Sequence, residues 1–307
     1  MKTYLLKHVN AFTDRPFMGN PAGVVLDARG LSDARMQAVA REMNLSETAF
    51  ILPPSVRNAD IQIRWFTPQV EVPLCGHATI AAFHALAVEG MAGMKTSGTY
   101  RFRVQTKSGI LGVVVEKKYS ASMIEFQIPL PKFKGINEVS PALLNALGIS
   151  AGEVEPRLPF VRQSYLYLPL KRFSTVKAMK PDLKKLLECL RATHTLGICV
   201  FSLKTIEKSS AVHSRFFAPA AGIDEDPVTG SANGPLGWYL YTYVVPGGFS
   251  IPSFILPDGR VEFIGEQGDV IGRRGRVKIR LRVSGEGVEH LSIAGEAVTI
   301  MDSLMDC

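Results

Sequence analysis

RWFTPQVEVPLCGHA at residues 64–78 and RFFAPAAGIDEDPVTGSA at residues 215–232 are two copies of one sequence pattern. Each copy begins with Arg, an aromatic residue, Phe, one further residue and Pro. Each ends with Pro, an aliphatic residue, one further residue, Gly, one further residue and Ala. The second copy has three extra residues between its prolines, after which the copies align at an offset of 154 residues (His77 against Ser231). A repeat at half the chain length predicts two similar domains related by a pseudo-two-fold axis, with the copies facing each other.

Composition is consistent with two domains. The chain has 307 residues, of which 46% are hydrophobic, enough for two cores of about 150 residues each. The formal net charge is +7, but Lys and Arg are spread along the chain without a nucleic-acid motif, so we expect no nucleic-acid partner. The densest basic stretch, GRRGRVKIRLRV at 272–283, alternates basic and aliphatic residues and predicts a half-buried strand with a basic outer face. An acidic partner surface is the alternative interpretation of this stretch.

Cellular context follows from the cysteines and the start of the chain. The four cysteines show no CxxC spacing, and MKTYLLKHVNAFTD carries charges where a signal peptide needs an apolar run. We therefore expect a cytoplasmic protein with free thiols. No apolar stretch approaches the roughly 20 residues of a membrane span, so no membrane association is expected.

Local patterns predict an α+β fold of two domains, each a strongly curved sheet around one buried helix. Residues 76–88 are apolar nearly all round, so their helix must be buried. Its counterpart, about 231–243, contains two glycines and a proline, and its first turns are expected to be less regular. Pro129 and Pro131 indicate a linker. The expected domains are 1–128, completed by about 297–307, and 129–296.

The two helix starts are candidate binding sites. A Gly-x-Ala step precedes each buried helix, so Gly76 and Gly230 lie where backbone N–H groups lack helical partners and the helix dipole is positive. Two such ends facing one cleft would hold an anion, most simply a substrate carboxylate. The alternative is that these glycines only permit tight packing where strand turns into helix.

Three side chains are candidates for acid–base chemistry, each with an alternative. His77 starts the first helix, where the dipole favours a neutral imidazole that accepts or relays a proton, or it is a buried histidine bonded to a carbonyl. Asp226, which follows Glu225, is either an acid–base group or a helix cap. Glu47 lies between a polar helix end and an apolar strand, and its position alone does not separate a catalytic from a surface carboxylate. His84, in an apolar setting, is expected in the core.

Cys75 separates two mechanisms. A cofactor-independent racemase needs one thiolate and one thiol at the two helix starts to exchange a proton across a substrate carbon. Here the residue aligned with Cys75 is Thr229, whose hydroxyl is far too weak an acid to replace a thiol. Two-thiol racemisation is therefore disfavoured, and the alternative for Cys75 is a packing role. No metal-ligand spacing and no glycine-rich nucleotide loop occurs, so we expect no metal and no cofactor.

The chain resembles the phenazine-biosynthesis-like (PhzF-like) family along nearly its whole length. The motifs that carry the resemblance are AFTDRPFMGNPAGV (11–24), REMNLSETAF (41–50), RWFTPQVEVPLCGHAT (64–79), RFFAPAAGIDEDPVTGSA (215–232) and QGDVIGRRGRV (267–277). The resemblance implies the diaminopimelate-epimerase-like fold, with two similar domains, each a curved, barrel-like, mostly antiparallel sheet around a central helix. Racemases of that superfamily carry a cysteine in each half; this chain matches the first at Cys75 and departs at Thr229, as its PhzF-like relatives do.

The resemblance also implies a reaction, namely isomerisation by proton transfer without a cofactor. The best-understood member isomerises trans-2,3-dihydro-3-hydroxyanthranilate, with the glutamate of the SETAF motif, here Glu47, as the main acid–base group. The supporting residues map onto His77, Asp226 and Ser231. The substrate carboxylate is expected near the Gly76 and Gly230 helix ends. The further substrate-binding candidates are Thr229, Cys75 and Asn20. Family members are often homodimers.

One departure and two alternatives remain. Many relatives continue GSAH where this chain has Asn233, which cannot titrate, followed by Gly234 and Pro235; this bears on the substrate more than on the reaction type. The second hypothesis is an amino-acid racemase or epimerase with Cys75 as one base. The third is a non-catalytic protein that binds a small molecule or interacts with another protein.

Overall fold

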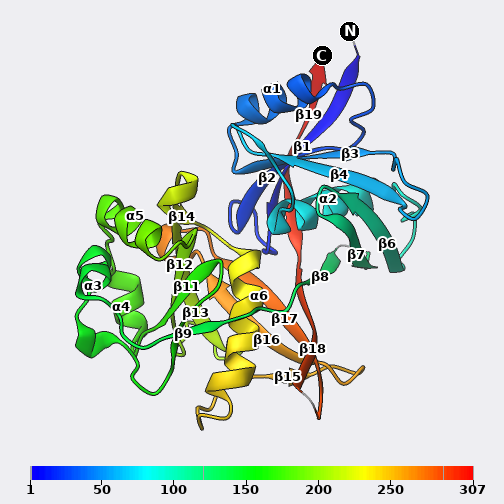
Figure 1. Cartoon of the computed structure of the whole chain (residues 1–307). Helices are drawn as coiled ribbons and strands as arrows, with labels where there is room; N and C mark the ends of the chain where they lie inside the picture. The colour runs from blue at the N-terminus through cyan, green and yellow to red at the C-terminus, as the bar shows by residue number, and fades with distance from the viewer. Residues whose placement is uncertain (1, 120, 286, 307) are drawn as a thin grey trace. The chain divides into compact units, whose positions relative to one another are not determined.

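The structure, a computed structural model, describes residues 2–119, 121–285 and 287–306. The chain forms two compact units: unit 1 comprises Met1–Gln127 and Ala294–Cys307, and unit 2 comprises Ile128–Ile293. In each unit a curved, mostly antiparallel sheet surrounds a central helix, α2 (Gly76–Val88) in unit 1 and α6 (Gly230–Tyr239) in unit 2 (Figure 1). The predicted α+β class is confirmed.

In unit 1 a curved sheet has one helix on each face. The remaining elements of unit 1 are β1 (Thr3–Ala11), β2 (Asn20–Val25), α1 (Asp33–Met43), β3 (Glu47–Leu52), β4 (Ile61–Phe66), β5 (Glu71–Val72), β6 (Gly98–Thr106), β7 (Gly109–Lys117), β8 (Ser122–Ile128) and β19 (Ala297–Asp306). The strand order is β19-β1-β2-β3-β4-β6-β7-β8, with β2–β3 and β4–β6 parallel, and the two-residue strand β5 is added beside β4. The last strand, β19, pairs with the first, so both chain ends lie together (Figure 1).

In unit 1, α2 forms where the sequence predicts a helix, and α1 is capped at both ends. The Ser32 hydroxyl accepts a hydrogen bond from the Arg35 amide at the start of α1, and Asn44 ends the helix in the left-handed conformation. The buried face of α1 packs on one side of the sheet. In α2 every residue from His77 to Ala87 is buried, which explains why the sequence offers no polar face there.

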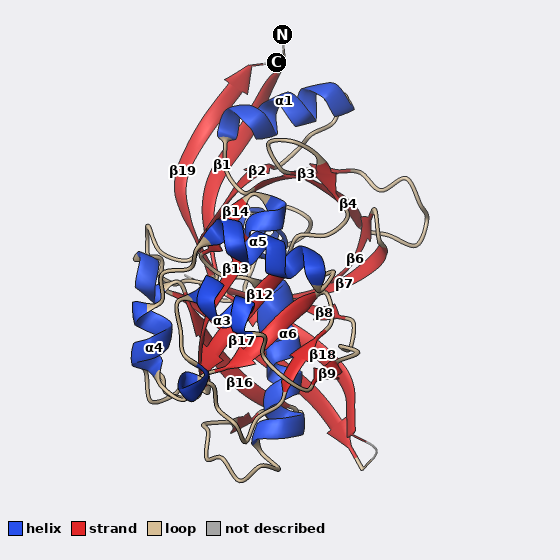
Figure 2. Cartoon of the chain, turned by 60° about the vertical axis from the view of Figure 1, so that its left-hand side comes forward, coloured by secondary structure: helices blue, strands red, loops and turns tan. Residues whose placement is uncertain are grey.

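Unit 2 repeats this plan with additional helices. Its remaining elements are β9 (Lys134–Ile136), α3 (Pro141–Leu147), η1 (Ala151–Glu153), β10 (Phe160–Arg162), β11 (Tyr165–Pro169), α4 (Phe173–Ala178), α5 (Leu183–Ala192), β12 (Gly197–Ser202), β13 (Val212–Ala218), η2 (Pro219–Ala221), β14 (Ile223–Asp226), η3 (Leu240–Val244), β15 (Phe254–Ile255), β16 (Val261–Gln267), η4 (Asp269–Ile271), β17 (Gly275–Ser284) and β18 (Gly287–Gly295), of which β18 ends at the unit boundary. Helices α3, α4 and α5 lie on one side of β11–β13 and α6 lies on the other (Figures 1 and 2).

Helix α6 corrects one prediction. The irregularity expected in its first turns is absent, because Gly230–Tyr239 is α-helical even with Pro235 inside it. The departure comes at the other end, where Leu240–Val244 continues as a π-helix. Gly237 serves packing, since a Cβ there would lie 2.2 Å from Ile279 of β17. Glycine thus lets α6 lie against the sheet more closely than any side chain would permit.

The repeat preserves an ion pair as well as a sequence. Arg64 of β4 donates two hydrogen bonds to Glu71, at 2.7 and 3.0 Å, and Arg215 of β13 donates two to Glu225, at 2.8 and 2.7 Å. In each unit the arginine also lies over the Phe two residues later, at 5.1 and 4.9 Å from the ring centre. The Arg-aromatic-Phe motif therefore has the same structural purpose in both units.

The basic strand also needs a correction. Val277, Ile279 and Leu281 of β17 are fully buried, as the alternation predicts. However, Arg280 is itself buried, and its Nε donates to Glu262 at 2.7 Å. Arg276 is likewise bound by carboxylates. The predicted basic outer face is therefore partly neutralised inside the protein.

Two further observations concern the cysteines and the helices. Cys75, Cys189 and Cys199 are free thiols. Cys307, expected as a fourth free thiol, lies outside the described residues. Within residues 2–119, 121–285 and 287–306, no helix has the length and apolar character needed to cross a membrane.

Candidate active site

Three reactive side chains of unit 1 meet where β3 and α2 begin. Glu47 is the first residue of β3, Cys75 is the N-cap residue of α2 and His77 is the second residue of that helix. The His77 Nε2 atom lies 3.3 Å from a Glu47 carboxylate oxygen, and the Nδ1 atom lies 3.5 Å from the Cys75 sulfur. The imidazole therefore stands between a carboxylate and a thiol, so the fold gathers three of the predicted site residues.

The His77 imidazole is neutral at physiological pH. Burial lowers the pKa of His77 to about 4, against the opposing effect of a hydrogen bond with the Pro21 backbone. Its contact with Glu47 is therefore not an ion pair near pH 7. A neutral imidazole offers one N–H donor and one lone pair, which allows it to orient a carboxylate or pass on a proton.

The adjoining strand brings Asn20 to this end of unit 1. Strands β2 and β3 are parallel, with Ala22 opposite Glu47, and the fully buried Asn20 lies two residues before Ala22. Gly76 is the first residue of α2, and the Cys75 side chain makes no capping hydrogen bond. The N-cap side chain thus leaves the first helical N–H groups to other acceptors, as an anion site requires.

In unit 2 the equivalent turn holds Asp226. Asp226 ends β14, opposite Phe216, just as Val72 lies opposite Trp65 in unit 1. The Thr229 hydroxyl donates to Asp226 Oδ2 at 2.5 Å and makes no capping bond to α6, whose first residue is Gly230. The predicted substrate-binding residue Thr229 is thus a partner of the predicted acid–base residue Asp226.

Ser231 has a partner that the sequence did not suggest. Its hydroxyl lies 3.1 Å from the hydroxyl of Tyr165, the first residue of β11, 66 positions earlier. Gln267 was also missed, although it ends β16 and bonds to the Asp226–Thr229 turn. No short-range spacing signals either contact, because both join strands to a helix distant in sequence.

The histidine expected to be buried in unit 1 is His84, and the structure places it there. Its side chain is buried within α2. Burial lowers the pKa of His84 to about 4, and the nearby positive charge of Lys7 acts in the same direction. His84 is therefore a neutral core residue.

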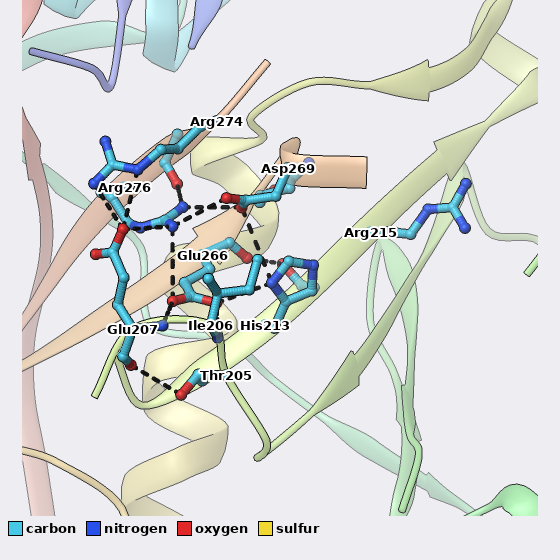
Figure 3. A network of polar contacts seen from close by, with 12 residues as sticks. Thr205, Ile206, Glu207, His213, Arg215, Glu266, Asp269, Arg274 and Arg276 are labelled. Atoms are coloured by element: carbon cyan, nitrogen blue, oxygen red, sulfur yellow. Dashed lines mark hydrogen bonds and ion pairs between the residues drawn. The ribbon is translucent and has the colours of Figure 1, made fainter. Parts of the chain in front are cut away.

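A buried charge network in unit 2 surrounds His213, for which the sequence offered no context. The fully buried Glu266 accepts hydrogen bonds from the His213 imidazole at 2.9 Å and from the amides of Ile206 and Glu207 at 2.9 and 2.7 Å (Figure 3). The Arg276 guanidinium binds Asp269 and Glu207, and lies 3.7 Å from Glu266. This network fastens the 203–211 loop to the end of β16.

Among the residues that the structure describes, two groups of side chains have atoms of the types that bind metal ions, within 4.8 Å of one another. They are Glu47, Cys75 and His77 in unit 1, and His213, Glu266 and Asp269 in unit 2. In the second group the Arg276 guanidinium already supplies the positive charge that its carboxylates need. The first group consists of the predicted acid–base residues, and the absence of a metal requirement there stays a prediction.

Glu266 makes the stability of unit 2 sensitive to acid. Burial raises its pKa, but the bonds from His213 and from two amides outweigh burial and lower the pKa to about 2. A lowered carboxyl pKa stabilises the fold above the ordinary value of 4.5, and the stabilisation is lost as pH falls toward 2. Between pH 7 and pH 3 we expect a loss of about 2 kcal/mol from this group.

Urea unfolding at both pH values measures this effect. In Glu266→Gln the decrease in unfolding free energy from pH 7 to pH 3 should be smaller than in the wild type by that amount. The exposed Glu188→Gln is the matched control and should leave the pH dependence unchanged. Equal pH dependence in the wild type and Glu266→Gln would contradict the assignment.

Comparison with known sequences points to one family. The family described as "Phenazine biosynthesis-like protein" matches residues 9–303. The chain is 36% identical to an uncharacterized isomerase of Clostridium acetobutylicum, with 99% of this chain and 98% of that protein covered. It is also 36% identical to the uncharacterized isomerase YddE of Escherichia coli K12, with 95% of each covered.

Solved structures agree with the sequences. A PhzF-family phenazine biosynthesis protein of Bacillus anthracis superposes with a TM-score of 0.86 at 32% identity, covering all of both chains. A hydroxyproline epimerase of Agrobacterium vitis, solved with bound trans-4-hydroxy-L-proline, superposes with a TM-score of 0.55 at 12% identity, covering 98% of this chain and 92% of that one. The second similarity concerns the fold alone and confirms the diaminopimelate-epimerase-like class.

Proposed function

Because the chain belongs to the phenazine-biosynthesis-like (PhzF) family, whose curated relatives are named isomerases, we propose that it is a cofactor-independent isomerase with Glu47 as its acid–base group. The substrate class is a small unsaturated or carbonyl-activated carboxylic acid. Glu47 removes a proton from one carbon, the electron pair of the broken C–H bond shifts the double bond, and the same carboxyl group protonates a second carbon. Atoms and electrons balance without an external oxidant or reductant.

The observation that carries this proposal is the 3.3 Å contact between Glu47 and the neutral His77. The Glu47 side chain is 16% exposed, so it is largely withdrawn from water without being sealed off. Partial burial keeps bulk water away from most of the carboxylate, and the imidazole lies close enough to orient it. A surface carboxylate, the alternative from sequence position, would have neither feature.

We assign the remaining residues to binding and orientation. The amides at Gly76 and Gly230 lie at helix starts, where the dipole favours the substrate carboxylate. Asp226 would orient the substrate for the proton transfer, and Ser231 would bind a polar group of the substrate.

A racemase that uses Cys75 is the second candidate, favoured by the 3.5 Å contact between the Cys75 sulfur and His77. Two-base racemisation needs a second group, and the Thr229 hydroxyl at the aligned position donates to Asp226. Cys75→Ser separates the two reactions. It should abolish racemisation by thiol chemistry and retain an isomerisation driven by Glu47.

The proposed function is tested with a defined panel of small 2,3- and 3,4-unsaturated carboxylic acids and 2-oxo acids incubated with the wild-type protein in D₂O. Proton NMR should show isomerisation of at least one acid, with deuterium entering at carbon. Proline and hydroxyproline in the same panel report the racemase alternative by chiral chromatography. Binding of an acid without isomerisation or exchange, found by thermal shift, would favour the non-catalytic alternative.

A further inference from the structure

We infer that Gln267 is a positioning residue that holds the Asp226 carboxylate in its working orientation. Gln267 is 1% exposed, and its side-chain amide lies against the turn that joins β14 to α6. This inference rests on the proposed function, since it assigns a role within the same site.

All four hydrogen-bonding positions of the Gln267 amide are used. Its Oε1 accepts from the Thr229 amide at 3.0 Å and from Asn233 Nδ2 at 2.8 Å. Its Nε2 donates to the Asp226 carbonyl at 2.8 Å and to Thr229 Oγ1 at 3.0 Å. The partners fix which end is which, because a backbone amide only donates and a carbonyl only accepts. Gln267 thus bonds to both ends of the Asp226–Thr229 turn and to Asn233 in the first turn of α6.

This arrangement determines where the Thr229 hydroxyl proton points. Thr229 Oγ1 accepts from Gln267, so its single proton is directed to Asp226 Oδ2, 2.5 Å away. A hydrogen bond to a carboxylate is stronger than one between neutral groups. The chain of hydrogen bonds from Gln267 through Thr229 to Asp226 therefore fixes the rotation of the Asp226 carboxyl group. The bond from Gln267 to the Asp226 carbonyl fixes the backbone that carries it.

The backbone after Gln267 encloses the same turn. Gly268 has a φ of +86°, and a Cβ there would lie 2.6 Å from the Pro227 carbonyl oxygen. At Gly275, the start of β17, a Cβ would lie 2.2 Å from Val228. Glycine at both positions lets the chain lie directly against Pro227 and Val228.

The opposite face of β16 supplies the support that positioning requires. Adjacent residues of a strand point to opposite faces, so Glu266 faces away from Gln267. Glu266 is fully buried and held by His213 and by the amides of Ile206 and Glu207 (Figure 3). A strand end fixed on one face gives the amide on its other face a stable place from which to orient Asp226.

Two variants that remove hydrogen bonds without changing size much test the inference. Gln267→Met deletes all four bonds, and Thr229→Val deletes the hydroxyl that reaches Asp226. On the acid identified by the D₂O panel, each should lower kcat about 10–10²-fold, the effect of misplacing a reacting group by roughly 1 Å. KM should change much less, because the lost interaction acts on the chemical step. Thr229→Ser keeps the hydroxyl and should recover most of kcat.

A matched control separates positioning from stability. Val200→Ala removes two methyl groups from the buried cluster on the other side of unit 2 and should lower the unfolding midpoint without lowering kcat at 25 °C. If Val200→Ala lowers kcat as much as Gln267→Met does, Gln267 acts only through stability and the inference is wrong. It is also wrong if Gln267→Met retains wild-type kcat.

Hydrogen exchange of the Thr229 amide, measured by NMR, requires no substrate. Gln267→Met removes the acceptor of that amide, so exchange should accelerate about tenfold or more, whereas Thr229→Ser should keep it slow. Unchanged exchange in Gln267→Met overturns the inference whether or not a substrate is known. If no acid in the panel reacts, the proposed function fails while accelerated exchange still supports the Gln267 network.

Discussion

Glu47→Gln should lower kcat for the isomerised acid by about 10²–10⁴-fold, the usual contribution of a general acid–base group. Glutamine has nearly the same shape and can still contact His77, but it cannot take up a proton at neutral pH. The expected loss is therefore in kcat and in kcat/KM together, with substrate binding little affected. Steady-state kinetics at pH 7 on the acid found in the D₂O panel measures both constants.

The control for this prediction is Glu42→Gln, the same substitution on the exposed surface of α1. It should retain wild-type kinetics. Full turnover by Glu47→Gln would remove Glu47 from the mechanism and would leave Cys75 and His77 as the remaining candidates in unit 1. Loss of turnover with loss of folded structure, seen by circular dichroism, would instead call for Glu47→Asp, which should retain part of kcat.

Arg215→Met should destabilise unit 2 by about 3–5 kcal/mol, because it leaves a buried carboxylate without its partner. The Arg215 side chain is 7% exposed and Glu225 is 13% exposed. The Arg215 Nη1 atom also donates to the carbonyls of Val176 and Met179, at 2.9 and 2.7 Å. Methionine fills similar space but supplies none of these hydrogen bonds.

The repeat provides a matched control for Arg215→Met. Arg64→Met removes the equivalent ion pair of unit 1, whose arginine is 19% exposed, and should cost about 1–2 kcal/mol. Trp65 and Trp238, the two tryptophans of the chain, lie one in each unit. Urea unfolding followed by Trp238 fluorescence in a Trp65→Phe background, and by Trp65 fluorescence in a Trp238→Phe background, reads the units separately. Equal costs for the two arginine variants would contradict the account.

The fold was predictable because its main signals are local or repeated. The apolar run of 76–88 predicts α2 at its observed bounds, Gly76–Val88. The irregularity of α6 was placed at its wrong end, because Pro235 and the glycines suggest disruption but do not reveal the sheet against which the helix packs. Strand β18 (Gly287–Gly295) carries only a weak apolar alternation, so no local pattern predicts it.

The site was less predictable, since most of its contacts join distant parts of the chain. The bonds of Gln267 to Asp226 and Thr229 span 41 and 38 residues, and the His213–Glu266 contact spans 53. No spacing rule detects such pairs. Glu47 was ambiguous from its own surroundings, and only the family resemblance singled it out; its contact with His77 supplies the physical argument that position in the sequence lacked.

The central claim is that Glu47 transfers a proton at a substrate carbon, and a crystal structure of Glu47→Gln with the identified acid tests it most directly. The account predicts that the side-chain oxygen or nitrogen at position 47 lies about 3–3.5 Å from the carbon that loses its proton, the range of a reactive geometry. It also predicts that the substrate carboxylate accepts hydrogen bonds from amides at the Gly76 or Gly230 helix start. A bound acid whose reacting carbon lies against Cys75, with position 47 turned away from it, would contradict the account.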